Sequence, residues 1–171
     1  MISTQPKWIG VCAAAIFALG AACTSLQAQQ ALPGVSTTRS SAAVEYLYPE
    51  QVTIAANQPS EIALHFRIAD GLHINSHQPR QPELIPTVFS IPEGAGARLE
   101  SVRYPAGSDY ALALDPGTKL SVYSGEFTLQ ARIVAEKGNH LVEGRLRYQA
   151  CDRNQCLPPK TIPVAIDVIG K

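Results

Sequence analysis

The sequence predicts an all-β domain, and three features support that prediction. Apolar and polar residues alternate over several segments, which is the period of a half-buried β-strand. The 13 prolines and 12 glycines are spread along the chain, which suits many short strands joined by turns. We find no apolar stripe at helical spacing that continues for four turns. The fold class is therefore all-β.

Length and composition narrow the class of protein. A chain of 171 residues corresponds to one domain with a tail. A hydrophobic content of 46% supplies a core, so the chain is not intrinsically disordered. The 14 Lys and Arg residues balance 14 Asp and Glu residues, which argues against nucleic-acid binding because that function needs a basic excess. Four cysteines are too few for a disulfide-dense scaffold.

Residues 1–28 are predicted to be a signal peptide. Lys7 precedes an uncharged apolar run from Trp8 to Ala22. A run of about 15 residues is short for a membrane span, which needs roughly 20, but it suits the apolar region of a secretory signal. We therefore expect an extracytoplasmic domain, periplasmic in a bacterium, in a compartment where disulfides persist.

Two processing sites remain open. The stretch from Leu19 to Cys23 resembles a bacterial lipobox, although Gly20 stands where that motif usually has leucine. Cleavage before Cys23 would make this residue a lipidated N-terminus. Its lipid would be the domain's one attachment to a membrane. Cleavage after Ala28 would release a protein without that anchor. Cys12 is removed in both cases.

The remaining chain divides into a flexible linker and the β-domain. Residues 29–43 are small and polar, as in a tether, and residues 44–171 form the domain. Its clearest strands are expected where alternation is cleanest, over residues 61–68, 126–134, 140–148 and 161–168. Pro163 lies on the outward face of the last of these, which indicates an edge strand or a position that needs no backbone donor.

Weaker strands complete the predicted sheet content. They are expected over residues 44–48, 51–55, 72–75, 87–91, 99–104 and 120–123. Many short strands with turns between them favour an immunoglobulin-like antiparallel β-sandwich. The Cys…Trp…Cys pattern of true immunoglobulin domains is absent, since the one tryptophan, Trp8, falls in the signal peptide.

The last two cysteines are the main candidates for chemistry. Cys151 and Cys156 lie between two clear strands, and four intervening residues let their sulfurs meet. As a structural bond, this disulfide would close only its own loop and contribute about 2 kcal/mol. As a redox site, it would be accessible, with Arg153 and Lys160 near enough in sequence to favour a thiolate. A metal site is the weakest of the three interpretations, because no histidine is near in sequence.

The residues around these cysteines resemble a known family. An aromatic-Gln-small-Cys segment, a short loop and a Cys-x-Pro-Pro segment are similar to the active site of the N-terminal periplasmic domain of the thiol:disulfide interchange protein DsbD. In this chain the two segments are Tyr148 to Cys151 and Cys156 to Pro159. Supporting similarity covers roughly residues 45–169 and includes the segments 70–75, 104–105 and 123–126.

The resemblance implies a function and roles for individual residues. The domain would relay reducing equivalents from a membrane electron transporter or a thioredoxin-like donor to oxidised periplasmic proteins, as a protein-disulfide reductase component without cofactor or metal. Cys156 would enter mixed disulfides and Cys151 would resolve them. The family shields its disulfide with a cap loop, which here corresponds to residues 107–116. Candidate cap or loop-support residues are Asp109, Tyr110, Tyr148 and Arg153.

The chain also departs from the family pattern. The best-known member has one residue more between its cysteines. It continues into a membrane transporter and a thioredoxin-like domain, whereas this sequence ends at Lys171, so we expect a standalone copy that meets its partners in trans. The alternative function is a non-catalytic exported binding or scaffold module with a structural loop disulfide.

The histidines are weaker candidates. His73 and His77 have the spacing of metal ligands on a helix, but on a strand they would lie about 13 Å apart. We therefore expect no metal there, and we place His73 near the redox loop or in the core. His65 and His140 are expected to be exposed strand residues. No Ser/His/Asp arrangement, carboxylate pair or phosphate-binding loop stands out.

Overall fold

The computed structural model describes residues 42–47, 51–112 and 117–171. The predicted signal peptide, both processing sites and nearly all of the predicted linker lie outside these ranges. The described residues form strands and no helix, so they include no helix with the length and hydropathy of a membrane span.

The strands form three four-stranded sheets. The first contains, in spatial order, β1 (Val44–Leu47), β3 (Ser60–Ile68), β9 (Glu126–Val134) and β6 (Arg98–Arg103). The second contains β2 (Gln51–Ile54), β12 (Lys160–Gly170), β10 (Gly138–Tyr148) and β5 (Val88–Ser90). The third contains β11 (Ala150–Cys151), β4 (His73–Asn75), β8 (Lys119–Tyr123) and β7 (Ser108–Ala111). All pairs are antiparallel except β2 with β12.

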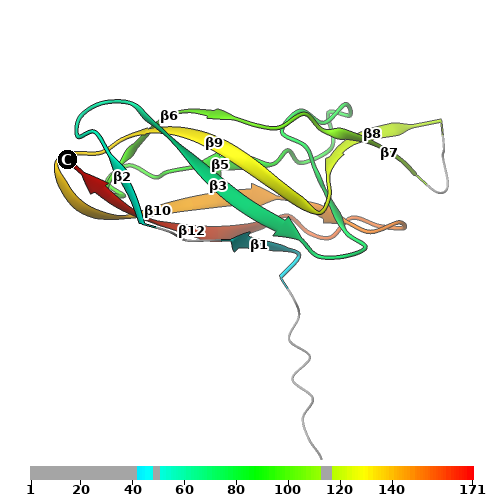
Figure 1. The fold of residues 1–171 in the computed structure, drawn as a ribbon. Coiled ribbons are helices and arrows are strands. Elements are labelled where there is room, and N and C mark those ends of the chain that lie inside the picture. The colour runs from blue at the N-terminus through cyan, green and yellow to red at the C-terminus, as the bar shows by residue number, and fades with distance from the viewer. Residues whose placement is uncertain (1–41, 48–50, 113–116) are drawn as a thin grey trace, which may run out of the picture. The chain divides into compact units, whose positions relative to one another are not determined.

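The core lies between the first two sheets. In Figure 1, β3 and β9 belong to one layer and β10 and β12 to the other. Alternate side chains of all four strands are buried in a single apolar cluster, as expected for stacked sheets. It includes Leu64, Phe66, Leu129, Ile133, Val142, Leu146, Val164 and Ile166. The predicted all-β, immunoglobulin-like sandwich is confirmed.

The clear strands are confirmed, with changes at their ends. β9 has the predicted bounds, while β10 begins two residues early, at Gly138, and β12 extends to Gly170. The prediction of an edge strand at Pro163 is wrong for β12 as a whole, since β12 lies between β10 and β2. β2 pairs only with the segment from Asp167 to Gly170, however, so Pro163 is paired with β10 alone. A proline is tolerated there because no second strand needs its backbone donor.

Two strands were not predicted. β7 falls inside the segment expected to be a cap loop, and the two-residue β11 falls at the start of the cysteine loop. Both are too short to show periodicity, so only their pairing with β8 and β4 defines them. These strands build the third sheet, whose β7–β8 hairpin extends from the right-hand end of the sandwich in Figure 1.

The third sheet is continuous with the sandwich. β3 leads into β4 through a turn in which Gly71 has a φ of 78°, a left-handed conformation that favours glycine. β10 leads into β11 through the single residue Gln149. The packed strands of the core therefore set the position of the cysteine loop.

The position of the core predicts that substitution of two leucines by alanine has very different effects on stability. Leu129 is fully buried in β9, whereas Leu141 in β10 is 66% exposed. We expect Leu129→Ala to lower the free energy of unfolding by about 2–5 kcal/mol, because it leaves a cavity. Leu141→Ala, the matched control, should change it by no more than about 0.5 kcal/mol. Urea unfolding followed by circular dichroism measures both, and equal effects would contradict this placement of the core.

Candidate functional site

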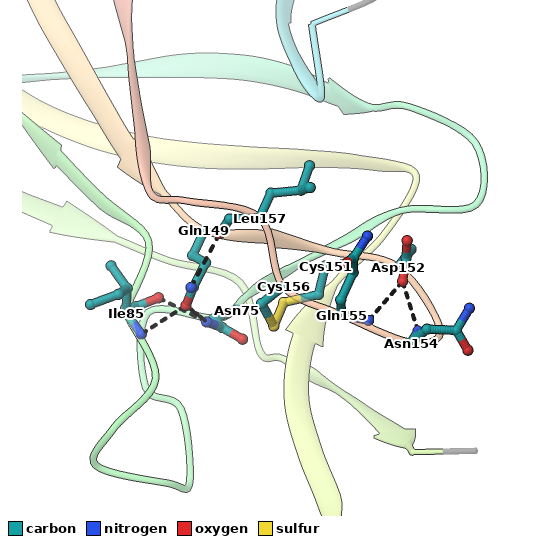
Figure 2. Close-up of a disulfide and its surroundings, with 9 residues drawn as sticks. All are labelled: Asn75, Ile85, Gln149, Cys151, Asp152, Asn154, Gln155, Cys156 and Leu157. Atoms are coloured by element: carbon teal, nitrogen blue, oxygen red, sulfur yellow. Dashed lines mark hydrogen bonds between the residues drawn. A yellow bond between two sulfur atoms is a disulfide. The ribbon is translucent and has the colours of Figure 1, made fainter. Parts of the chain in front are cut away.

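The two cysteines of the loop form a disulfide. Cys151 ends β11, and Cys156 returns opposite it as an antiparallel bridge partner, with a Cα–Cα distance of 3.9 Å. The sulfurs thus meet across the loop, as the spacing predicted. Figure 2 shows the bond at the base of the loop, with residues 152–155 projecting beyond it.

The two ends of the disulfide differ in exposure. Cys151 is 2% exposed and lies in the third sheet, whereas Cys156 is exposed to solvent. Thiol–disulfide exchange begins with attack of a thiolate on one sulfur along the S–S axis, so access decides which sulfur is attacked. Cys156 is thus the more accessible end of the disulfide.

The loop is held in one turn by Asp152. Its backbone N–H donates to the Gln155 carbonyl over 2.9 Å. Its Oδ1 accepts the backbone N–H groups of Asn154, at 2.7 Å, and Gln155, at 2.8 Å (Figure 2). These bonds, the Asn154 bond first, lower the pKa of Asp152 below its ordinary value, and the nearby His73 adds a smaller effect in the same direction. The carboxylate is therefore the form that fixes the turn.

Gln149 joins the ends of the loop to the neighbouring strand. Its Nε2 donates to the Leu157 carbonyl over 3.3 Å, and the Leu157 N–H donates to the Ala150 carbonyl over 2.8 Å. Gln149 Oε1 accepts the Asn75 Nδ2–H at 3.2 Å and the Ile85 N–H at 3.4 Å (Figure 2). The sequence motif includes Gln149 but gives no sign of its role, because its partners Asn75 and Ile85 are distant in sequence.

His73 lies directly beside the disulfide. It is the register partner of Cys151 across β4 and β11, and it is 3% exposed. Its ring stacks at a tilt on Tyr110, with 4.0 Å between ring centroids. Burial lowers the pKa of His73, and the negative charge of Asp152 partly opposes that shift. Of the two expected places for His73, near the redox loop or in the core, the structure shows the first, with the ring buried beside the loop.

A small pocket adjoins the disulfide on this side. Its volume is about 160 Å³. Both cysteines, His73 and the loop residues line it, together with two leucines that sequence analysis did not single out, Leu112 and Leu120. Leu120 belongs to β8 and Leu112 follows β7, so the β7–β8 hairpin supplies an apolar wall. No motif could have revealed these leucines, because only strand pairing brings them here.

The structure brings two of the four expected support residues to the site. Tyr110 contacts it through His73, and Arg153 lines the pocket from the loop. Tyr148 is instead a buried core residue at the end of β10. The pKa of Tyr148 is raised above its ordinary value, mainly because the side chain is buried.

Asp109 also points elsewhere. Its carboxylate forms ion pairs with Arg80 and Lys119, and the Arg80 bond is the main cause of its lowered pKa. The expected cap segment 107–116 contains strand β7 over residues 108–111, and residues 113–116 lie outside the described ranges.

His77, the second histidine of the 73/77 spacing, makes contacts of its own. The His77 ring stacks on Tyr104, with 3.7 Å between ring centroids, and His77 Nδ1 lies 3.0 Å from the Thr87 carbonyl oxygen. Within the described ranges, no three His, Cys, Asp or Glu side chains are grouped so that they could hold a metal ion.

A family match extends over most of the sequence. The family model described as "Thiol:disulfide interchange protein DsbD, N-terminal" matches residues 43–167. The chain belongs to the DsbD N-terminal domain family. The resemblance inferred from the cysteine motif is thereby confirmed, and DsbD-family membership supports a role in thiol–disulfide exchange.

Two solved structures are similar to the chain. The DsbD N-terminal domain of Neisseria meningitidis in its reduced form is 20% identical, with a TM-score of 0.45 over 67% of this chain and 82% of that one. The N-terminal periplasmic domain of ScsB from Proteus mirabilis is 13% identical, with a TM-score of 0.47 over 72% of this chain and 44% of that one. No curated protein sequence is significantly similar to this chain.

The Asp152 turn predicts pH-dependent order in the loop of this DsbD-family domain. The folded pKa of Asp152 is depressed, so its contribution is present above the unfolded pKa of about 3.9 and is lost as the pH falls through the lower folded pKa. We expect Asp152→Ala to accelerate hydrogen exchange of the Asn154 and Gln155 amides. Asp152→Asn, which keeps an acceptor oxygen, should largely preserve their protection. NMR-detected exchange measures both, and unchanged protection in Asp152→Ala would contradict the turn.

Proposed function

We propose that this domain exchanges thiols and disulfides with other extracytoplasmic proteins through the Cys151–Cys156 pair. The observation that carries the proposal is the unequal exposure of the two cysteines in a short, hydrogen-bonded loop of a DsbD-family domain. A bond that closes only its own loop contributes modestly to stability, whereas its exposed end is available to a partner.

In the reductive direction, the exchange takes place in two steps. A thiolate of a reduced donor attacks Cys156 Sγ, the Cys151–Cys156 bond breaks, and Cys151 leaves as a thiolate that takes up a proton. A second donor thiolate then attacks the donor sulfur of the mixed disulfide, which releases the Cys156 thiolate and oxidises the donor. The domain has then gained two electrons and the proton on Cys151, and it gains a second proton when the Cys156 thiolate is protonated.

Delivery to an oxidised protein reverses these roles. The Cys156 thiolate attacks the target disulfide and forms a mixed disulfide, releasing one target thiolate, which takes up a proton. The Cys151 thiolate then attacks Cys156 Sγ and releases the second target thiolate, which is protonated in turn. We propose a membrane electron transporter or thioredoxin-like domain as donor and oxidised periplasmic proteins as recipients, which makes the domain a protein-disulfide reductase component. The dithiol itself is the redox group, so no cofactor is required.

The support residues have distinct proposed roles. Arg153 places a positive charge at the pocket and favours a thiolate there. Tyr110 of β7 packs against the His73 ring and holds its position. Asp109 stabilises the same strand through ion pairs with Arg80 and Lys119. Tyr148 fixes the end of β10 in the core, immediately before the loop.

Export is part of the proposal. Residues 1–28 act as a signal peptide, or processing at the lipobox makes Cys23 a lipid anchor. The ScsB domain that resembles this chain is described as periplasmic, which supports an extracytoplasmic location.

A redox titration tests exchange against a purely structural bond. We expect the disulfide to equilibrate in glutathione buffers and to be reduced at a potential above about −300 mV. Thiol alkylation followed by mass spectrometry gives the reduced fraction at each potential. A bond that stays oxidised below that value would support the alternative, a non-catalytic scaffold module with a structural disulfide.

Single-cysteine variants test the direction of attack. We expect Cys151→Ala, which leaves the exposed Cys156, to form a mixed disulfide with oxidised glutathione on the order of tenfold faster or more than Cys156→Ala, because Cys151 is buried. Time-resolved mass spectrometry of the adduct measures both rates at equal pH. Equal rates, or faster reaction of the variant that keeps Cys151, would contradict the assigned roles.

A further inference from the structure

The exchange steps above do not use the histidine that lies beside the buried sulfur. His73 and Cys151 are register partners on adjacent antiparallel strands, so their side chains leave the third sheet on the same face. Both line the pocket at the disulfide, and His73 is 3% exposed. A titratable ring is thus enclosed next to the sulfur that must gain and lose a proton.

The ring nitrogen Nε2 of His73 is buried, and it has no hydrogen-bond partner among the described residues. Buried polar atoms are nearly always hydrogen-bonded, so an exception needs an explanation. In the disulfide, the Cys151 sulfur carries no proton. Reduction converts it into a thiol, which is a hydrogen-bond donor. The Cys151 thiol, which can donate a hydrogen bond to His73 Nε2, is therefore present only in the reduced state.

We propose that His73 accepts the proton of the Cys151 thiol when the disulfide closes and returns it when the disulfide opens. The inference rests on the proposed exchange function and assigns a proton carrier to its buried step. It also explains why a sulfur held away from solvent can become a thiolate: water has little access to it, and burial by itself disfavours the charged form.

The closing step begins from the mixed disulfide. In the mixed disulfide, Cys156 is bonded to the partner sulfur and Cys151 is a thiol. The Cys151 proton moves to His73 Nε2, the Cys151 sulfur bonds to Cys156 Sγ, and the bond to the partner sulfur breaks. The electron pair leaves with the partner thiolate, which then takes up a proton from the imidazolium or from solvent. Over the forming and closing steps together, the two domain thiols are oxidised and the partner disulfide is reduced.

The surroundings of His73 suit a proton acceptor. Burial lowers its pKa, so the ring is neutral and can accept a proton near neutral pH. Asp152, whose own pKa is lowered by backbone hydrogen bonds, is a carboxylate that stabilises the imidazolium once it forms. Among the described residues, the other titratable or charged groups are Tyr110, whose ring contacts His73 from β7, and Arg153, which lines the pocket from the loop; Leu112 and Leu120 are apolar.

The lifetime of a defined mixed disulfide tests this role. The reduced domain is mixed with oxidised glutathione, quenched with acid at intervals, and analysed by mass spectrometry for the Cys156–glutathione adduct. We expect His73→Gln to slow decay of the adduct roughly tenfold or more, within the range of general acid–base catalysis. His73→Phe keeps a ring against Tyr110 without a proton acceptor and should be equally slow. The control His140→Gln, whose ring bonds to the Glu136 carbonyl away from the pocket, should match the unsubstituted domain.

The pH profile separates proton transfer from packing. With His73 present, the closing rate should level off above the pKa of the His73–Cys151 pair. In His73→Gln it should continue to rise about tenfold per pH unit at pH values where the rate of the unsubstituted domain is already level. Slowing by the same factor at every pH, or no slowing, would overturn the inference. If the unsubstituted domain neither forms nor resolves the adduct, the exchange function itself fails; if it does both and the variants match it, only the role of His73 fails.

Discussion

Alternate side chains of β3 and β9 pack against those of β10 and β12, and the position of the disulfide depends on this contact. β3 runs on into β4, and β10 runs on into β11, so both strands that flank the site are extensions of core strands. Their pairing sets His73 opposite Cys151. Burial of the core thus fixes the geometry of the loop.

The site combines a rigid setting with one accessible atom. The side chains of Asp152 and Gln149 form hydrogen bonds with backbone groups of the loop and of the residue that follows it. These bonds restrict the loop to one conformation before a partner arrives. Preorganisation of this kind lowers the entropic cost of docking. Within the resulting frame, the sheet covers Cys151 and leaves Cys156 open. One short disulfide therefore has two chemically different ends.

Sequence periodicity located the long strands because their apolar positions repeat over many residues, as in β3 and β9. It did not locate β7 and β11, since strands of four and two residues carry too little pattern. Because strand β7 was not predicted, Asp109 and its sequence neighbour Tyr110 were both expected to support the loop. Neighbours on a strand point to opposite faces, so Tyr110 reaches His73 while Asp109 pairs with Arg80 and Lys119.

The sequence alone determined that this is a β-sandwich with one local cysteine pair, because strand alternation and cysteine spacing are both local properties. It also contained the motif that places the chain in the DsbD family. Only the tertiary structure decided which cysteine is buried, that His73 faces it, and that Leu112 and Leu120 wall the pocket. These facts depend on pairing between strands far apart in the chain, and such pairing has no signature in any single segment.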